Sequence, residues 1–234
     1  MPRQLSLGIN LNDDATFENF FLLDQDHKCQ VLAVLRNQLV SGDEPFVYLW
    51  GPTGCGVSHL LQASCHQAST NGLQVQYLPL AELLDYPPQS LLENLEQLPL
   101  ICLDDVQLVA GNTHWEEALF SLYNRVRQAH GRLLVGADCT PRELPLQLPD
   151  LQSRLGWGPV FQLQSSDDEL KTLIIQFRAS RRGMELSDDV ARYLINRAAR
   201  DLSELMACLD TLESASLEEK RKLSIPFVKQ VFGW

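Results

Sequence analysis

The stretch Phe46 to Gln62, FVYLWGPTGCGVSHLLQ, sets the organisation of the chain. It opens as a short apolar run, passes through a glycine loop and continues with the apolar spacing of a helix. The loop, Gly51 to Ser58, fits the phosphate-binding pattern G-x-x-x-x-G-K-S/T, except that Val57 stands at the lysine position. Glycines let successive backbone N–H groups point at phosphate oxygens, and the helix that follows adds the positive end of its dipole. The stretch therefore predicts a strand, a nucleotide loop and a helix, with Ser58 placed to reach a magnesium ion.

Val57 leaves two interpretations of this loop open. The lysine of the pattern is a point charge against the β- and γ-phosphates. A charged hydrogen bond contributes about 1.5–3 kcal/mol net, so its absence weakens binding roughly tenfold to a hundredfold. The loop either still binds a diphosphate, ADP or another nucleoside diphosphate, while hydrolysing poorly, or it is a structural relic that binds none.

Strands and helices alternate along the first two thirds of the chain. Apolar runs predict strands at 46–50, 73–78, 98–103, 132–137 and 160–163. Helical spacing marks 26–40, 58–69, 80–85, 89–97 and 115–129, and residues 141–151 read as a proline-rich connector. This order indicates βαβ units and a mostly parallel sheet, in which ligands bind outside the carboxyl ends of the strands. Gly51, Asp104 and Asp138 each follow a strand end.

The acidic pair Asp104-Asp105 ends the apolar run LPLICLDD. Beside a phosphate loop, the first carboxylate helps to hold magnesium together with Ser58, and the second polarises a water molecule. The alternative is a solvated strand end without chemistry.

From residue 165 onward the composition changes, and no strand is expected. Helix-capping signals recur at Ser166, Ser187, Asp201 and Ser216, and Pro226 suits the first turn of a last helix. We therefore expect an α/β domain over 11–164 and a small all-helical domain over 165–234, preceded by a tail over 1–10.

Composition excludes several classes of protein. The chain has 234 residues, of which 45% are hydrophobic, and no apolar run approaches the length of a membrane span. The first residues lack the apolar core of a signal peptide, so a cytoplasmic location is expected. Six cysteines form no C-x-x-C pair, which argues against a zinc site or a disulfide framework. The net charge of −11 gives no overall attraction to DNA, so protein partners are expected and sequence-specific DNA binding is not.

Two arginines and the tail each allow two interpretations. Arg154, in DLQSRLGWG, is either a surface ion-pair former or a cation presented to the nucleotide of a neighbouring molecule. Arg200 is either a lid arginine that folds back on phosphate or a solvated helix-end residue. The run Gln4-Leu5-Ser6-Leu7 is either a frayed terminus or edge strand, or an extended peptide with a polar anchor and apolar side chains.

Taken together, these residues resemble an AAA+ ATPase module, and more closely the bacterial replication initiator DnaA and its relatives, over nearly all of residues 11–234. The matching motifs are TFENF at 16–20, the glycine loop with SHLL at 58–61, LDDVQ at 103–107, GAD at 136–138 before PREL at 141–144, and SRL at 153–155 before WG at 157–158. The resemblance implies a P-loop module with a parallel sheet flanked by helices, followed by a helical lid. The initiator continues into a DNA-binding domain where this sequence stops, so no such domain is expected.

The resemblance also assigns roles to individual residues. Arg154 becomes an arginine finger that acts in trans on ATP bound to the initiator. Asp138 becomes a sensor at a strand end, Arg200 a lid arginine facing the chain's own nucleotide, and the segment from Phe20 to Leu23 a neighbour of the adenine. The full nucleotide-contacting set is Phe20, Leu23, Gly51, Thr53, Gly54, Cys55, Gly56, Val57, Ser58, His59, Asp104, Asp105, Asp138 and Arg200, with Ser58 and Asp104 as the metal residues.

The function implied is that of a regulatory adaptor. Gln4, Leu5, Ser6 and Leu7 match a peptide of DnaA-related regulators that binds the DNA polymerase sliding clamp. With the DNA-loaded clamp, such a protein stimulates ATP hydrolysis by the initiator and represses re-initiation, while its own hydrolysis is weak or absent. AAA+ modules also associate head to tail, so a homo-oligomer is a further expectation. The alternatives are a free-standing ATPase of the helicase-loader kind, which intrinsic turnover would favour, and a DNA-binding module.

Overall fold

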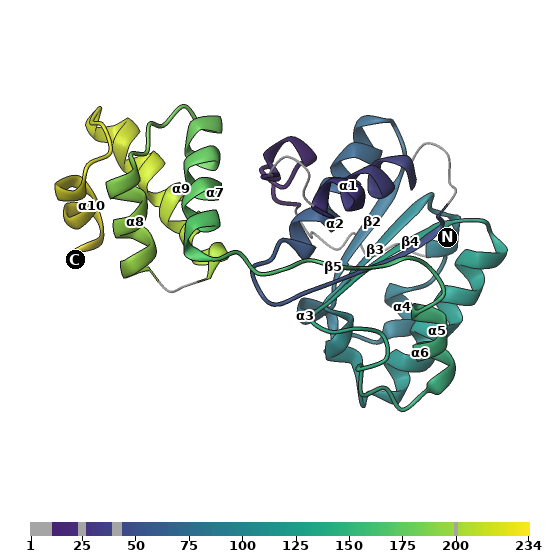
Figure 1. Ribbon diagram of the computed structural model, residues 1–234. Helices are drawn as coiled ribbons and strands as arrows, with labels where there is room; N and C mark the ends of the chain where they lie inside the picture. Colours follow the sequence, from purple (N-terminus) through teal and green to yellow (C-terminus); the bar gives the residue numbers. More distant parts are fainter. Residues whose placement is uncertain (1–10, 23–26, 39–43, 199–200) are drawn as a thin grey trace. The chain divides into compact units, whose positions relative to one another are not determined.

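The computed structural model describes residues 11–22, 27–38, 44–198 and 201–234 (Figure 1). They form two compact units. The first contains the described residues up to Pro52 together with Gly56–Leu163. The second contains Gln164–Trp234 and the three loop residues Thr53–Cys55. The tail residues Gln4, Leu5, Ser6 and Leu7, together with Leu23 and Arg200, lie outside the described residues.

A five-stranded parallel sheet forms the centre of the first unit, which confirms the predicted fold class. The strands are β1 (Phe46–Trp50), β2 (Val75–Pro79), β3 (Leu100–Asp104), β4 (Arg132–Ala137) and β5 (Val160–Gln162). They lie in the order β2-β3-β4-β1-β5. The central strand β4 therefore lies between β3, which ends at the acidic pair, and β1, which leads into the glycine loop.

Helices cover both faces of this sheet. They are α1 (His27–Gln38), α2 (Val57–Thr70), α3 (Leu80–Leu83), α4 (Pro88–Leu91), α5 (Thr113–Gln128) and α6 (Pro149–Leu155), with short 3₁₀ turns at Phe17–Asn19, Leu95–Gln97 and Val106–Val109. In Figure 1, α1 and α2 lie on one face and α4, α5 and α6 on the other. Burial on both faces explains why the strands read as continuous apolar runs.

The side chains of β3 alternate between these two faces. Cys102 faces α2, where its thiol lies 3.4 Å from the thiol of Cys65 and 3.7 Å from the carbonyl oxygen of Leu61. Its neighbour Ile101 belongs instead to the core that contains Trp115 of α5. The six cysteines are not joined by disulfide bonds.

Two expectations about the first unit are wrong. The helix predicted over 89–97 is interrupted, because α4 ends at Leu91 and Leu95–Gln97 form only a 3₁₀ turn. The connector predicted over 141–151 gives way to helix α6, which begins at Pro149 and ends at Leu155. Proline suits the first turn of a helix, because the N–H group that it lacks would have no partner there. Leu151 and Leu155 face the core, and the backbone N–H of Leu148 donates to Glu116 Oε2 at 2.8 Å. Arg154 therefore lies in the last turn of a helix and not on a connector.

The second unit is helical in its described residues, as expected. Its helices are α7 (Asp168–Arg181), α8 (Asp188–Arg197), α9 (Leu202–Glu219) and α10 (Ile225–Phe232), around a core of Ile175, Ala179, Leu194, Leu209 and Val228. Asp201 caps α9 and Ser224 caps α10, in which Pro226 lies in the first turn. Asp167, and not Ser166, caps α7. No helix begins at Ser216, whose hydroxyl donates to the carbonyl oxygen of Arg221 at 2.6 Å near the end of α9.

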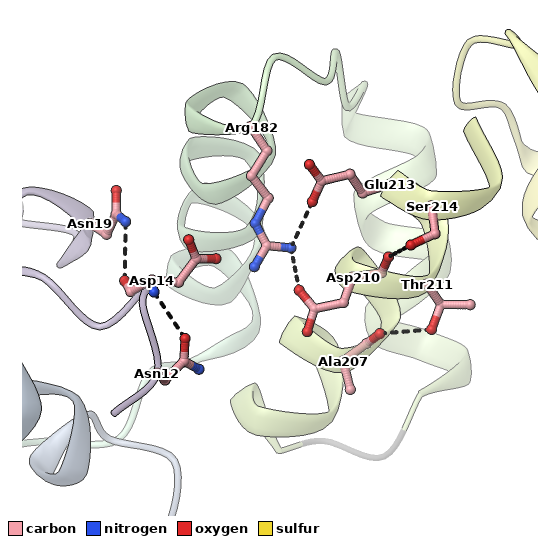
Figure 2. A network of polar contacts seen from close by, with 9 residues as sticks. All are labelled: Asn12, Asp14, Asn19, Arg182, Ala207, Asp210, Thr211, Glu213 and Ser214. Atoms are coloured by element: carbon pink, nitrogen blue, oxygen red, sulfur yellow. Dashed lines mark hydrogen bonds and ion pairs between the residues drawn. The ribbon is translucent and has the colours of Figure 1, made fainter. Parts of the chain in front are cut away.

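Arg182 joins two helices of this unit. Its Nη1 lies 2.6 Å from Asp210 Oδ1 and 3.7 Å from Glu213 Oε2 (Figure 2). The Arg182 side chain is only 11% exposed. A cation this buried needs paired carboxylates, so the end of α7 is held against α9. No helix in the described part of the chain is both long and apolar enough to cross a membrane.

Two glycines in the turn after α6 differ in the space that a β-carbon would have. A β-carbon at Gly158 would overlap the carbonyl oxygen of Phe46, which is backbone and cannot rotate away. A β-carbon at Gly156 would meet only ordinary contacts, the nearest being the carbonyl oxygen of Ser153 at 3.7 Å.

We therefore expect Gly158→Ala to lower the free energy of unfolding by about 1–3 kcal/mol or more, because it overpacks the backbone against β1. Gly156→Ala should change it by less than about 0.5 kcal/mol. Urea unfolding midpoints of the two variants measure the difference. Equal midpoints would show that the turn does not depend on this close approach.

Candidate functional site

The glycine loop connects β1 to α2. Its first residue, Gly51, donates its N–H to the carbonyl oxygen of Ala137 at 3.2 Å, which ties the loop to the end of β4. Gly54 and Gly56 have φ of +78° and +102°, the left-handed region that favours glycine. Gly56 precedes α2 and has no side chain to cap it. The first-turn N–H groups of α2 therefore face the loop as an anion-binding helix end.

Val57 fills the position of the missing lysine with an apolar group. Its side chain is 9% exposed. A β-carbon added to Gly136 of β4 would lie 2.7 Å from Val57 Cγ1 and 2.8 Å from Asp104 Oδ1, so these two side chains meet over that glycine. Val57 thus belongs to the packing under the loop. Attraction of phosphate at this position rests on the backbone and the helix end.

Two aromatic rings lie beside the loop. Phe20 packs on Gly56, where a β-carbon would lie 2.7 Å from its Cε2. The Phe20 and His59 rings are 5.5 Å apart between centroids. His59 Nε2 lies 2.8 Å from the carbonyl oxygen of Thr16. The sequence-predicted residues Phe20 and His59 are therefore brought together with the loop, of which Thr53 is exposed and Cys55 is buried.

Asp104 ends β3 and is only 2% exposed. The hydroxyl of Tyr77 donates to its Oδ2 at 2.6 Å, and the backbone N–H of Asp105 donates to its Oδ1 at 3.1 Å. Ser58 also donates a hydrogen bond to this carboxylate. Burial raises the pKa of Asp104 above its ordinary value, and the bonds from Tyr77 and Ser58 act in the opposite direction. Burial, followed by the nearby Asp104 charge, raises the pKa of Tyr77.

The structure thus unites Ser58 and Asp104, the two residues predicted for metal binding. Magnesium keeps several waters and takes only one or two protein ligands besides the phosphates. A serine hydroxyl bonded to a carboxylate at the mouth of a phosphate loop fits that requirement. In the described residues, no group of three or more His, Cys, Asp or Glu side chains offers a separate metal site.

Asp105 and Asp138 lie at the same edge of the sheet but are held differently. Asp105 has a φ of +58°, and its Oδ1 accepts from Gln107 Nε2 at 3.0 Å. Asp138 is exposed directly after β4. Burial, and then the hydrogen bond to Asp138, raise the pKa of the Cys139 thiol to about 11. Asp105 and Asp138 are therefore close to the strand ends, as predicted.

Sequence reasoning missed a chain of hydrogen bonds that leads away from Asp104. Gln62 Nε2 donates to the Tyr77 hydroxyl at 3.3 Å, and Gln62 Oε1 accepts the backbone N–H of Asn12 at 2.8 Å. His66, one turn further along α2, lies 2.9 Å from the carbonyl oxygen of Asn12. Bonds from Asp14 to Asn12 and from Asn19 to Asp14 hold this segment in a turn (Figure 2). Polar residues spaced along an otherwise buried helix were the available signal.

Arg154 lies over aromatic rings. Its guanidinium carbon is 3.9 Å from the centroid of Trp157 and 6.0 Å from that of Phe120. The guanidinium of Arg127 lies over the same Trp157 ring at 4.5 Å. Neither arginine forms a salt bridge with a carboxylate in the described residues. This pair of cations around one half-exposed tryptophan is the second feature of this unit that is suited to binding or catalysis.

A parallel sheet in this order, with a phosphate loop, a buried aspartate at the neighbouring strand end and a helical lid, defines an AAA+ module. The chain belongs to the family of the bacterial DnaA ATPase domain, whose sequence model matches residues 11–162. A second model, described as the lid domain of Hda, matches residues 168–232. The chain is thus an AAA+ protein of the Hda and DnaA kind.

The chain is also similar to individual proteins. A Haemophilus influenzae protein, described only as uncharacterized, is 45% identical over 235 residues that cover both chains completely. Domain III of the replication initiation protein DnaA of Thermotoga maritima has a TM-score of 0.78 at 22% identity, over 96% of this chain and 98% of that one. DnaA of Aquifex aeolicus bound to AMPPCP has a TM-score of 0.72 at 21% identity, over 89% and 68% of the two chains. The likeness to these two structures shows the fold.

The network around Asp104 makes stability depend on pH. Its folded-state pKa lies above the unfolded value of about 3.9, so the folded state keeps the proton to a higher pH. The free energy of unfolding therefore falls as the pH rises from the unfolded pKa through the folded one. Tyr77→Phe removes a hydrogen bond to the charged carboxylate and raises that folded pKa further.

We expect Tyr77→Phe to cost on the order of 1.5–3 kcal/mol of stability at pH 7, and less at pH 4, because the raised pKa of Asp104 leaves more of its carboxyl protonated there in the folded state. Urea unfolding at the two pH values measures this, with Tyr86→Phe at an exposed tyrosine as the control. An equal loss at both pH values would contradict a role through the charge of Asp104.

Proposed function

We propose that this chain is a regulatory partner of the bacterial initiator DnaA, which holds ADP or another nucleoside diphosphate in its own loop and promotes hydrolysis of ATP bound to the initiator. One observation carries the proposal. The loop has a buried valine in place of its cation, whereas Arg154 lies in a helix turn over Trp157 without a carboxylate partner among the described residues. The charge suited to phosphoryl transfer is thus separated from the chain's own loop.

The loop is suited to holding a nucleotide more than to hydrolysing it. Its backbone cradle, the α2 helix end and the Ser58–Asp104 pair are present. Magnesium bound there would neutralise diphosphate charge. The missing lysine acts mainly on the β- and γ-phosphates, so ATP loses more than ADP. This arrangement supports weak or absent hydrolysis by the chain itself.

The position of Arg154 favours action in trans. Helix α6, which carries it, packs with α5 on the face of the sheet opposite to α2, the helix that begins at the loop (Figure 1). A guanidinium supplied by a neighbouring molecule stabilises the charge of the phosphoryl-transfer transition state. Membership of the DnaA family supports a DnaA-type AAA+ module with bound ATP as this neighbour.

The tail supplies the second contact of this proposal. Gln4, Leu5, Ser6 and Leu7 would bind the DNA polymerase sliding clamp as an extended peptide, with pockets for alternate side chains. Recruitment to a clamp on DNA raises the local concentration of the adaptor near the initiator. Conversion of initiator-bound ATP to ADP then represses re-initiation. A homo-oligomer, in which Arg154 reaches a second copy of this chain, is the competing assembly.

Replacing the arginine tests the central role. With the initiator, the loaded clamp and DNA, we expect Arg154→Ala to lower the stimulated hydrolysis toward the initiator's own rate, because arginines of this kind contribute roughly 10³–10⁵-fold. Arg192→Ala, at an exposed arginine of α8, serves as the charge-matched control and should retain stimulation. Equal hydrolysis with both variants would exclude Arg154 as the finger. In a parallel assay, unchanged clamp binding after replacing Gln4 and Leu7 by alanine would remove the tail's role.

A nucleotide titration tests the loop. ADP at a hundred times its dissociation constant should add about 2.7 kcal/mol to the free energy of unfolding. We expect Val57→Lys to tighten ADP binding roughly tenfold to a hundredfold, and Val57→Ala not to tighten it. The readout is the ligand-dependent shift in unfolding midpoint. No shift with ADP or ATP would mean that the loop is a relic, and ATP turnover dependent on Asp105 would favour a free-standing ATPase.

A further inference from the structure

Trp157 lies on a rigid framework although half of its surface is exposed. Its backbone N–H donates to the carbonyl oxygen of Arg154 at 3.1 Å, which closes the turn after α6. The next two residues are fastened to β1, because Gly158 packs directly on the carbonyl group of Phe46 and Pro159 accepts the N–H of Tyr48 at 2.9 Å. The backbone on both sides of the ring is therefore fixed.

Aromatic packing fixes the ring itself. Trp157 and Tyr123 meet edge to face, with 6.3 Å between centroids and an interplanar angle of 85°. Tyr123 is buried and stacks on Phe46 at 4.4 Å. A continuous row of rings thus runs from strand β1 to the surface. Trp157 is 50% exposed, so the surface that it leaves open is part of a firm platform.

Two arginines share this platform in spite of their like charge. Arg154 and Arg127 lie 3.9 Å and 4.5 Å from the Trp157 centroid. Their positive charges also favour the ionised form of Tyr123 and so oppose the rise of its pKa by burial. Attraction of each guanidinium to the electron-rich ring face is the interaction that offsets their repulsion. These contacts limit each long arginine side chain to a few of its rotamers.

We infer that Trp157 is a positioning residue for Arg154: it holds the guanidinium in place before a partner's phosphate group arrives. The inference rests on the proposed function. An arginine that is already ordered loses less conformational freedom when it meets the transition state, so the benefit appears in the rate of the assembled complex. Trp157 itself touches no reacting atom in this scheme.

The first test uses the isolated chain and needs no initiator. Stacking on an indole should shift the side-chain NMR signals of Arg154 upfield through the ring current. Trp157→Phe should keep part of that shift, and Trp157→Leu should remove all but the small contribution of the more distant Phe120 ring. Arg154 signals unaffected by Trp157→Leu would overturn the inference whatever the function of the chain.

The second test measures stimulated hydrolysis at saturating concentrations of the chain, with the initiator, loaded clamp and DNA. We expect Trp157→Leu to lower the maximal rate about three- to tenfold and Trp157→Phe by less than about twofold, with little change in the concentration needed for half-maximal stimulation. Tyr86→Leu, at an exposed aromatic residue elsewhere, should leave both values unchanged. A merely structural ring would allow leucine to replace tryptophan, so equal rates for the leucine and phenylalanine variants would overturn the inference.

Arg154→Ala in the same assay separates the two proposals. If it retains full stimulation, the proposed function fails and the positioning role fails with it. If it abolishes stimulation while Trp157→Leu matches the unmodified chain, the proposed function stands and only the positioning role is excluded. A loss with both, together with rescue by phenylalanine, supports the inference.

Discussion

The buried carboxylate of Asp104 is the group on which this architecture depends. A charge with 2% exposure is tolerable only where hydrogen bonds replace its water. Here they come from three directions: the end of β2 through Tyr77, the first turn of α2 through Ser58, and the backbone of Asp105. Satisfying this one group therefore aligns two strand ends with the glycine loop. The candidate nucleotide site forms at this edge of the sheet because the Asp104 carboxylate cannot be left without hydrogen-bond partners.

The glycine loop shares its packing with Asp104, whereas Arg154 does not. Val57 and Asp104 meet over Gly136, so the residue that removes the loop's cation is also part of the packing that holds the aspartate. The loop loses charge without losing shape. The cation over Trp157, on a helix of the opposite face, is held by a separate set of contacts. The glycine loop and the Arg154 site are thus held by independent sets of contacts, which agrees with the proposal that they serve different nucleotides.

Local patterns in the sequence predicted much of this fold, because strands buried on both faces leave continuous apolar runs and a glycine loop has few alternatives. They failed where the outcome depended on distant partners. Pro149 reads as a breaker until Leu151 and Leu155 find a core to face. Ser216 looks like a helix start, yet its hydroxyl serves the end of α9. The roles of Tyr77 and Gln62 arise from parallel register and from the path of residues 12–16, and neither is encoded in a short window of sequence.

The anchoring of Asn12 on α2 sets a length scale. Gln62 and His66 hold the backbone of Asn12 on both its N–H and its carbonyl side. Five residue steps lead from this anchor back to Leu7, and an extended chain spans at most about 3.3–3.6 Å per residue. A partner that grips Leu7 therefore keeps that anchor within about 18 Å. While a partner holds Leu7 in this way, any molecule on which the AAA+ body acts must lie close beside that partner. Lengthening the segment between residues 7 and 12 would loosen this geometric restraint without altering either binding surface.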